Sequence, residues 1–127
     1  MERDHTRPDG ATDEAVEAAG KMTEALETLE RARGHLYSFH QLMGETDLGL
    51  DEVLALLRGE DAELAGEIER ELVGRNVLDG RWTFQVVEEF DAMYWSAFRD
   101  YERRVRETLV GGRRHVYEAE MKARRRS

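Results

Sequence analysis

The feature that most constrains this chain is a row of apolar residues near its start, spaced alternately three and four residues apart. This spacing repeats every seven residues over about four heptads, and it places every member on one side of an α-helix. The row predicts a long helix over residues 13–43, with Thr12 or Asp13 as N-cap and Gly44 at its end. We expect the row to pack lengthwise against a partner helix. Its members are Ala15, Ala18, Met22, Ala25, Leu29, Ala32, Leu36, Phe39 and Met43.

A second apolar row predicts another long helix, over residues 83–110, and Gly111-Gly112 is expected to end it. The members of this row are Phe84, Val87, Phe90, Tyr94, Phe98, Tyr101, Val105 and Leu109. Asp79-Gly80 predicts a turn before the helix. Shorter helices are expected over residues 50–58, 61–73 and 113–125.

These rows predict an all-α fold, an elongated helical bundle in which two long helices pack with shorter ones. Residues 1–11 have no apolar periodicity and contain Pro8 and Asp9-Gly10, so we expect a flexible N-terminal arm before a single helical domain over residues 12–127. The segment NVLDGRWTFQVV, residues 76–87, is also compatible with a β-hairpin, and that alternative stays open.

The amino-acid composition excludes several kinds of functional site. The chain has no cysteine, which excludes disulfides, thiolate catalysis and thiolate metal sites. Its apolar runs are too short for a transmembrane helix, and no signal peptide is recognisable at its start. We therefore expect a cytoplasmic protein that does not enter a membrane.

The net charge of −9 is divided unevenly along the chain. Residues 1–100 carry 24 acidic and 10 basic side chains, whereas residues 101–127 carry 4 acidic and 9 basic ones. A basic tail of this kind attracts nucleic acid or an acidic partner. The chain as a whole is acidic and lacks a surface motif of aromatic and basic residues, so nucleic acid is not an expected partner.

One pattern of carboxylates predicts a metal site. Glu60 and Glu63 form an ExxE pair, and Glu88 and Asp91 follow after 24 residues as an ExxD pair. Carboxylates one helical turn apart are suitable ligands for Mg²⁺ or Mn²⁺. The arrangement resembles the metal motif of the all-α nucleotide pyrophosphatases, which implies a metal-dependent hydrolase with these four ligands. In a chain this acidic such pairs also arise by chance, and Glu60 follows Gly59 at an expected helix break.

A second candidate site follows the second long helix. Gly112 would present a free backbone N–H, and Arg113, Arg114 and His115 would add cations at the start of the last helix, which is how an anion is held. The competing interpretation is a joint between two helices with solvated arginines. His115 and Glu118, three residues apart, form either a weak metal-binding pair or a surface ion pair.

Four stretches also carry a family resemblance. These are ARGHLYSFHQLMGETDL, ELVGRNVLDGRWTFQVVEEFD, YWSAF and LVGGRRHVYEAEMK. They resemble a family of small acidic all-α proteins of haloarchaea that has no established function. The resemblance implies a salt-rich cytoplasm, where screening shortens the range of charge interactions.

From these observations we expect a non-catalytic helical-bundle protein that self-associates, as a homodimer, and that engages a protein partner through an aromatic helix face. No cofactor is expected under this hypothesis. The alternatives are a Mg²⁺- or Mn²⁺-dependent nucleotide pyrophosphatase and an anion-binding module.

Overall fold

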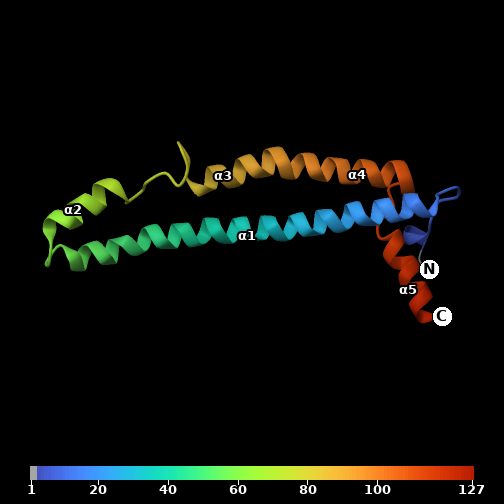
Figure 1. Cartoon of the computed structure of the whole chain (residues 1–127), viewed down its shortest axis with the longest axis horizontal. Coiled ribbons are helices and arrows are strands. Elements are labelled where there is room, and N and C mark those ends of the chain that lie inside the picture. The colour runs from blue at the N-terminus through green and yellow to red at the C-terminus, as the bar shows by residue number, and fades with distance from the viewer. Residues whose placement is uncertain (1–2) are drawn as a thin grey trace. The chain divides into compact units, whose positions relative to one another are not determined.

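The computed structural model describes residues 3–127 and shows an all-α protein (Figure 1). Its helices are α1 (Asp13–Leu57), α2 (Ala62–Glu71), α3 (Thr83–Phe90), α4 (Ser96–Val110) and α5 (Val116–Arg126), with a 3₁₀ turn at Arg3–His5 and a π-helical segment at Asp91–Trp95. No helix in this described range is both long and apolar enough to cross a membrane.

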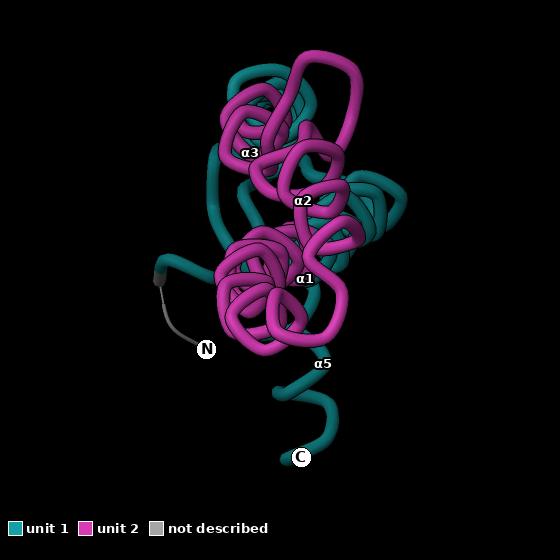
Figure 2. The backbone as a smooth tube through the Cα atoms, turned by 90° about the vertical axis from the view of Figure 1, so that its left-hand side faces the viewer, with its two compact units in different colours: residues 1–32, 92–127 teal, residues 33–91 magenta. Residues whose placement is uncertain are grey.

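The chain divides into two compact units, shown in different colours in Figure 2. Unit 1 comprises residues 1–32 and 92–127, and unit 2 comprises residues 33–91. The single helical domain expected from residue 12 stays a prediction. Helix α1 contributes its first part to unit 1 and the rest to unit 2.

Helix α1 begins as predicted but continues past its predicted end. Thr12 caps it, because its Oγ1 accepts a hydrogen bond of 3.1 Å from the N–H of Ala15. The predicted end at Gly44 does not occur, and residues 50–57 belong to the same helix. A glycine inside a helix costs only about 1 kcal/mol relative to alanine. Beyond it, Leu50 and Leu54 continue the apolar spacing, and Leu54 is buried, so packing maintains the helix.

Unit 1 has a small core formed by α1, α4 and α5. Its buried members are Val16, Ala19, Val110 and Val116, with Ala11, Val105 and Leu109 packed against them. Helix α5 approaches α1 closely at Gly20, where a Cβ atom would lie 2.9 Å from the Cβ of Tyr117. Only glycine permits this approach.

The segment predicted to be a flexible arm is held against the rest of unit 1. The guanidinium of Arg7 donates hydrogen bonds to both carboxylate oxygens of Glu120 on α5, at 2.9 and 2.7 Å, and another of 2.7 Å to Asp13. These carboxylates raise the pKa of Arg7 above its ordinary value. His5 Nδ1 lies within hydrogen-bond distance of the carbonyl of Arg114.

Unit 2 contains the remaining part of α1 together with α2 and α3. Asp61 caps α2 by accepting the N–H of Leu64 at 2.9 Å. The predicted turn at Asp79-Gly80 is present, with a single antiparallel bridge between Leu78 and Arg81. This bridge is all that remains of the hairpin alternative, since residues 83–90 are helical. Buried side chains of unit 2 are Leu54, Ala65, Thr83 and Val87.

Candidate functional site

Part of the predicted row on α1 faces inward. Four of its members, Ala18, Ala25, Ala32 and Phe39, are exposed, and the others, Ala15, Met22, Leu29, Leu36 and Met43, are half-buried. Positions one residue further along also face inward, so the packed face is rotated from the predicted one by less than about 100°. They are Val16, Ala19, Thr23, Leu26, Arg33, Tyr37, His40, Asp47 and Leu54.

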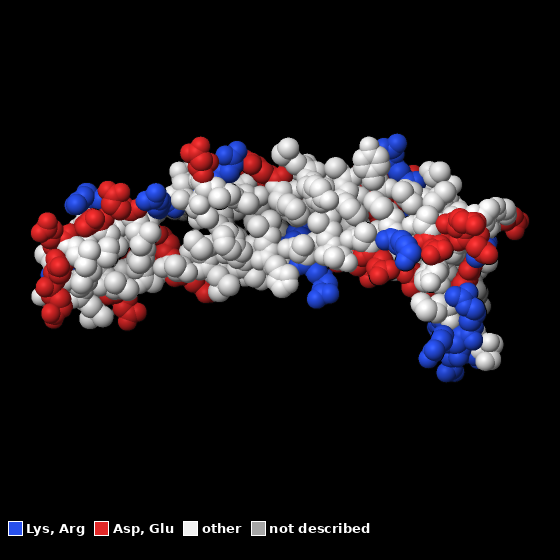
Figure 3. Space-filling view, viewed as in Figure 1, with Lys and Arg blue, Asp and Glu red and all other residues white. Residues whose placement is uncertain are grey.

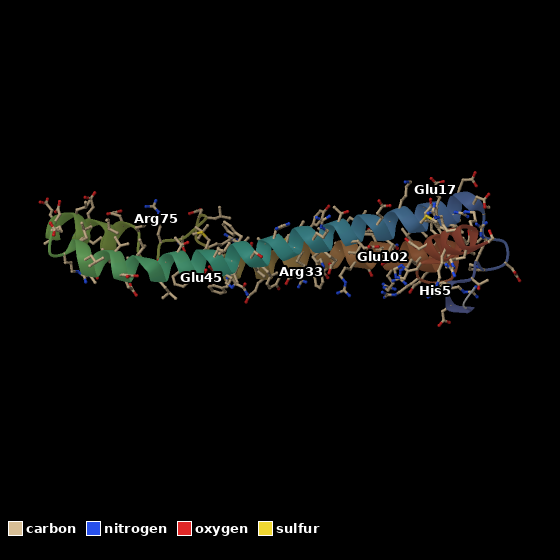
Figure 4. All side chains as sticks on the ribbon, turned by 90° about the horizontal axis from the view of Figure 1, so that it is seen from below. His5, Glu17, Arg33, Glu45, Arg75 and Glu102 are labelled. Carbon is tan, nitrogen blue, oxygen red and sulfur yellow. The ribbon has the colours of Figure 1, made fainter. Side chains whose placement is uncertain are left out.

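Polar contacts hold further residues of α1 inward in unit 2. The guanidinium of Arg33 (Figure 4) donates two hydrogen bonds to the carboxylate of Asp91, at 2.8 and 3.1 Å, and the hydroxyl of Tyr37 donates a third, at 2.7 Å. His40 Nδ1 lies 2.6 Å from the hydroxyl of Thr83. Such charge-assisted bonds are stronger than neutral ones, and an analysis of apolar spacing does not detect them.

The Arg33–Asp91 pair also sets the ionisation of its members. Arg33, by its hydrogen bonds, lowers the pKa of Asp91 below its ordinary value of 3.8. The hydrogen bond to Asp91 raises the pKa of Tyr37 above 10.0. Both shifts favour a carboxylate with its proton removed and a phenol that keeps its proton. This geometry serves to hold α3 against α1 and leaves no group ready for proton transfer.

A similar polar contact lies inside unit 1. The buried guanidinium of Arg106 donates to Glu102 at 2.6 Å and to the carbonyl of Gly112 at 2.9 Å. Glu102 (Figure 4) also accepts a bond of 3.1 Å from the hydroxyl of Thr23 on α1. Because each buried charge has a partner, this pair is structural.

The four carboxylates predicted as metal ligands lie on four different elements of unit 2. Glu60 lies in the turn after α1, Glu63 in the first turn of α2, Glu88 on α3, and Asp91 at the start of the π-helical segment. Asp91 is bound by Arg33. Among residues 3–127 no group of three or more His, Asp or Glu side chains is arranged to hold a metal ion. The structure therefore does not bring the four together as a Mg²⁺ or Mn²⁺ site.

The predicted anion site has the geometry of a joint. Gly111 and Gly112 adopt left-handed conformations, with φ of 64° and 78°, and the N–H groups of both donate to the carbonyl of Arg106. The N–H of Arg113 donates to the carbonyl of Val110. These amides are thus already used, as expected for the end of a helix. His115 and Glu118 approach to 3.8 Å as a surface pair.

Two hollows lie on the surface of unit 1. The first, of about 550 Å³, lies along α4 and is lined by acidic and basic side chains together, among them Glu27, Glu30, Asp100, Arg99, Arg103 and Arg114. The second, of about 630 Å³, is lined by His5, His115, Glu118, Ala119, Lys122, Ala123 and Arg126. Specific sites for small molecules are mostly apolar with a few converging polar groups, and the first hollow does not have this character.

The described surface also carries an apolar face. On the part of α1 in unit 2, exposed side chains recur with three-and-four spacing. We call this surface the 39–56 face; its members are Phe39, Leu42, Thr46, Gly49, Val53 and Leu56. Leu42 is 59% exposed and Leu56 is 73% exposed. This spacing is present in the sequence, but interpreting Gly44 as a helix end divides it into two parts.

Comparison of the chain with protein-family models, curated proteins and solved structures gives no match. The evidence on function therefore comes from the geometry of the chain itself.

Proposed function

We propose that this protein is a non-catalytic helical protein that acts by self-association. The observation that carries the proposal is the 39–56 face of α1 in unit 2, where Phe39, Leu42, Val53 and Leu56 are exposed. Apolar side chains grouped on one face of a monomer mark an interaction surface. Burying them between copies would stabilise the assembly by about 25 cal/mol for each Å² removed from water.

A second exposed group supports engagement of a further protein. Met93 and Tyr94 on the π-helical segment and Tyr101 on α4 are more than half exposed. Aromatic and methionine side chains are enriched in protein interfaces. We place this activity in a salt-rich cytoplasm, which agrees with the haloarchaeal resemblance and with the 14 acidic and 5 basic side chains of residues 33–91.

The test measures mass in solution by light scattering over a wide range of concentrations. We expect a reversible increase from the monomer to the dimer mass in the wild-type protein. Leu56→Glu should abolish the increase, because a charge buried in an apolar contact must lose its hydration. Leu48→Glu is the matched control: Leu48 is on the same helix and 70% exposed, but it lies about 120° from the centre of the 39–56 face.

A monomer mass for the wild-type protein at every concentration would contradict the proposal. Equal loss of dimer in the two variants would show that the association depends on general surface hydrophobicity and not on this face.

A further inference from the structure

Three of the five residues that join α4 to α5 have a left-handed backbone conformation. They are Gly111, Gly112 and His115, with φ of 64°, 78° and 59°. Glycine adopts this conformation without penalty, but a histidine is disfavoured there because of its Cβ atom. A residue stays in such a conformation only where contacts from its surroundings hold it.

Some of these contacts come from the other end of the chain. Residues 3–11, which we call the N-terminal strap, lie beside α5 (Figure 1). His5 Nδ1 lies within hydrogen-bond distance of the carbonyl of Arg114, and the guanidinium of Arg113 donates to the carbonyl of Thr6. Both contacts act on the two residues immediately before the strained histidine, so the strap holds the joint from outside.

Arg7 ties the strap to helices α1 and α5. Its guanidinium donates to both carboxylate oxygens of Glu120 on α5 and to Asp13 in the first turn of α1. The side chains of Arg7 and Glu120 are 31% and 18% exposed, so water screens this pair less than a fully exposed ion pair. The ring of Pro8 lies against the joint, where a Cβ atom on Gly111 would be 3.5 Å from its Cγ.

Helix α5 has few apolar contacts of its own. It buries one residue fully, Val116, and Tyr117 lies close to Gly20 of α1. Residues 121–127 are all exposed. A helix of 11 residues is marginally stable in water when it is isolated. The docking of α5 therefore depends to a large extent on the strap.

We propose that the N-terminal strap is a releasable clasp and that the glycine pair of the joint is its hinge. When the strap leaves, α5 turns away from α1 as a unit about Gly111 and Gly112, and α1 and α4 stay helical. His115 then relaxes, and the surface of α1 around Val16 and Ala19 is uncovered. The proposed self-association is independent of this clasp, because the clasp uses only contacts within unit 1.

Hydrogen exchange of the full-length protein, followed by mass spectrometry, tests the clasp. In Arg7→Ala we expect the amides of α5 to exchange about tenfold faster, because two hydrogen bonds between charged groups are lost. The amides of α1 and α4 should keep their wild-type rates. Arg103→Ala is the matched control, since Arg103 also donates to two carboxylates, Asp100 and Glu107, but both belong to its own helix.

Arg7→Lys adds an intermediate case. Lysine keeps the positive charge but cannot reproduce the bidentate geometry of arginine, so its effect on α5 should be smaller than that of Arg7→Ala. Trypsin gives a second measurement, because Arg113 and Arg114 place cleavage sites in the joint. We expect Arg7→Ala to be cut there faster than the wild type and Arg103→Ala to be cut at the wild-type rate.

Two results would overturn the clasp. Exchange that rises equally in α1, α4 and α5 of Arg7→Ala would show that the substitution loosens the whole of unit 1. Exchange of α5 that is already fast in the wild type, or that does not change in Arg7→Ala, would show that the strap does not hold this helix.

Discussion

At the level of single residues, Asp91 shows how a neighbouring cation decides the role of a carboxylate. Its two oxygens accept hydrogen bonds from Arg33 and Tyr37, and the ring of Tyr37 also lies 4.9 Å from the guanidinium carbon of Arg33. Glu88 precedes Asp91 by three residues and is exposed. The ExxD spacing treats the two as equivalent, but the structure pairs only Asp91 with a half-buried cation, Arg33. One sequence does not reveal this, because Arg33 is 58 residues away.

Substituting each carboxylate in turn tests whether Asp91 and Glu88 contribute differently to stability. We expect Asp91→Asn to lower the free energy of unfolding by about 1 kcal/mol, since it removes the charge that Arg33 binds. Glu88→Gln should leave the free energy of unfolding unchanged. Urea denaturation at pH 7 followed by circular dichroism measures both. Equal midpoints for the two variants would show that the Arg33–Asp91 pair does not stabilise the fold.

The same pair predicts a pH dependence. The folded-state pKa of Asp91 is below its ordinary value of 3.8, so its contribution is complete above that pH and is lost as the pH falls through the folded-state value. The difference in unfolding free energy between wild type and Asp91→Asn should therefore be constant near neutrality and disappear in acid. A difference that persists at the lowest pH would assign the effect of the substitution to packing.

At the level of elements, apolar periodicity predicted the helices better than their boundaries and faces. The helix over residues 83–110 is helical throughout, although Asp91–Trp95 adopt the π-helical form. Gly44 was predicted to end the first long helix because glycine is common at helix ends. A glycine ends a helix only where the chain beyond it turns away. The face of α1 was predicted only in part, because inward positions such as Thr23, Arg33 and His40 are polar. Their partners are distant in sequence, so only the folded chain shows which face packs.

Gly20 is the clearest example of an element-level constraint that the sequence does not show. Gly20→Ala places a methyl group 2.9 Å from the Cβ of Tyr117, an atom fixed by the backbone of α5, so α5 must shift. Gly34→Ala is the control, since a Cβ there meets nothing within 4 Å. We expect Gly34→Ala to stabilise the protein by up to ~1 kcal/mol and Gly20→Ala to destabilise it by about 1–3 kcal/mol.

Thermal denaturation ranks the two variants, and hydrogen exchange locates the effect. In Gly20→Ala the amides of α5 should exchange faster than in the wild-type protein. Equal stabilisation by both substitutions would show that α5 does not depend on a close approach to α1.

At the level of the whole molecule, acidic and basic side chains gather on different parts of the chain. Acidic side chains gather over α2 and the adjoining end of α1, and basic side chains gather over the end of α5 (Figure 3). The 39–56 face lies within the acidic part of the sequence. Glu45 and Glu52 flank it on one side, and both are exposed. An antiparallel dimer through this face brings these like charges together, and salt should therefore favour it.

This repulsion gives a test that depends on the direction of pairing. A twofold axis perpendicular to the helices keeps each flank on its own side, so Glu45 of one copy comes near Glu52 of the other. A parallel pairing would place the acidic flank opposite the apolar flank that contains Met43 and Leu50. We expect the double variant Glu45→Gln, Glu52→Gln to dimerise more tightly than wild type at low salt, by about 0.5 kcal/mol for each like-charge pair removed.

The gain should disappear in 1 M salt, where the Debye length is about 3 Å. The double variant Glu17→Gln, Glu24→Gln makes the same change in net charge at equivalent heptad positions of α1 in unit 1, away from the face. Sedimentation equilibrium at several salt concentrations compares the three proteins. If the two double variants tighten the dimer equally, net charge alone controls association, and the acidic flank of the 39–56 face has no local role.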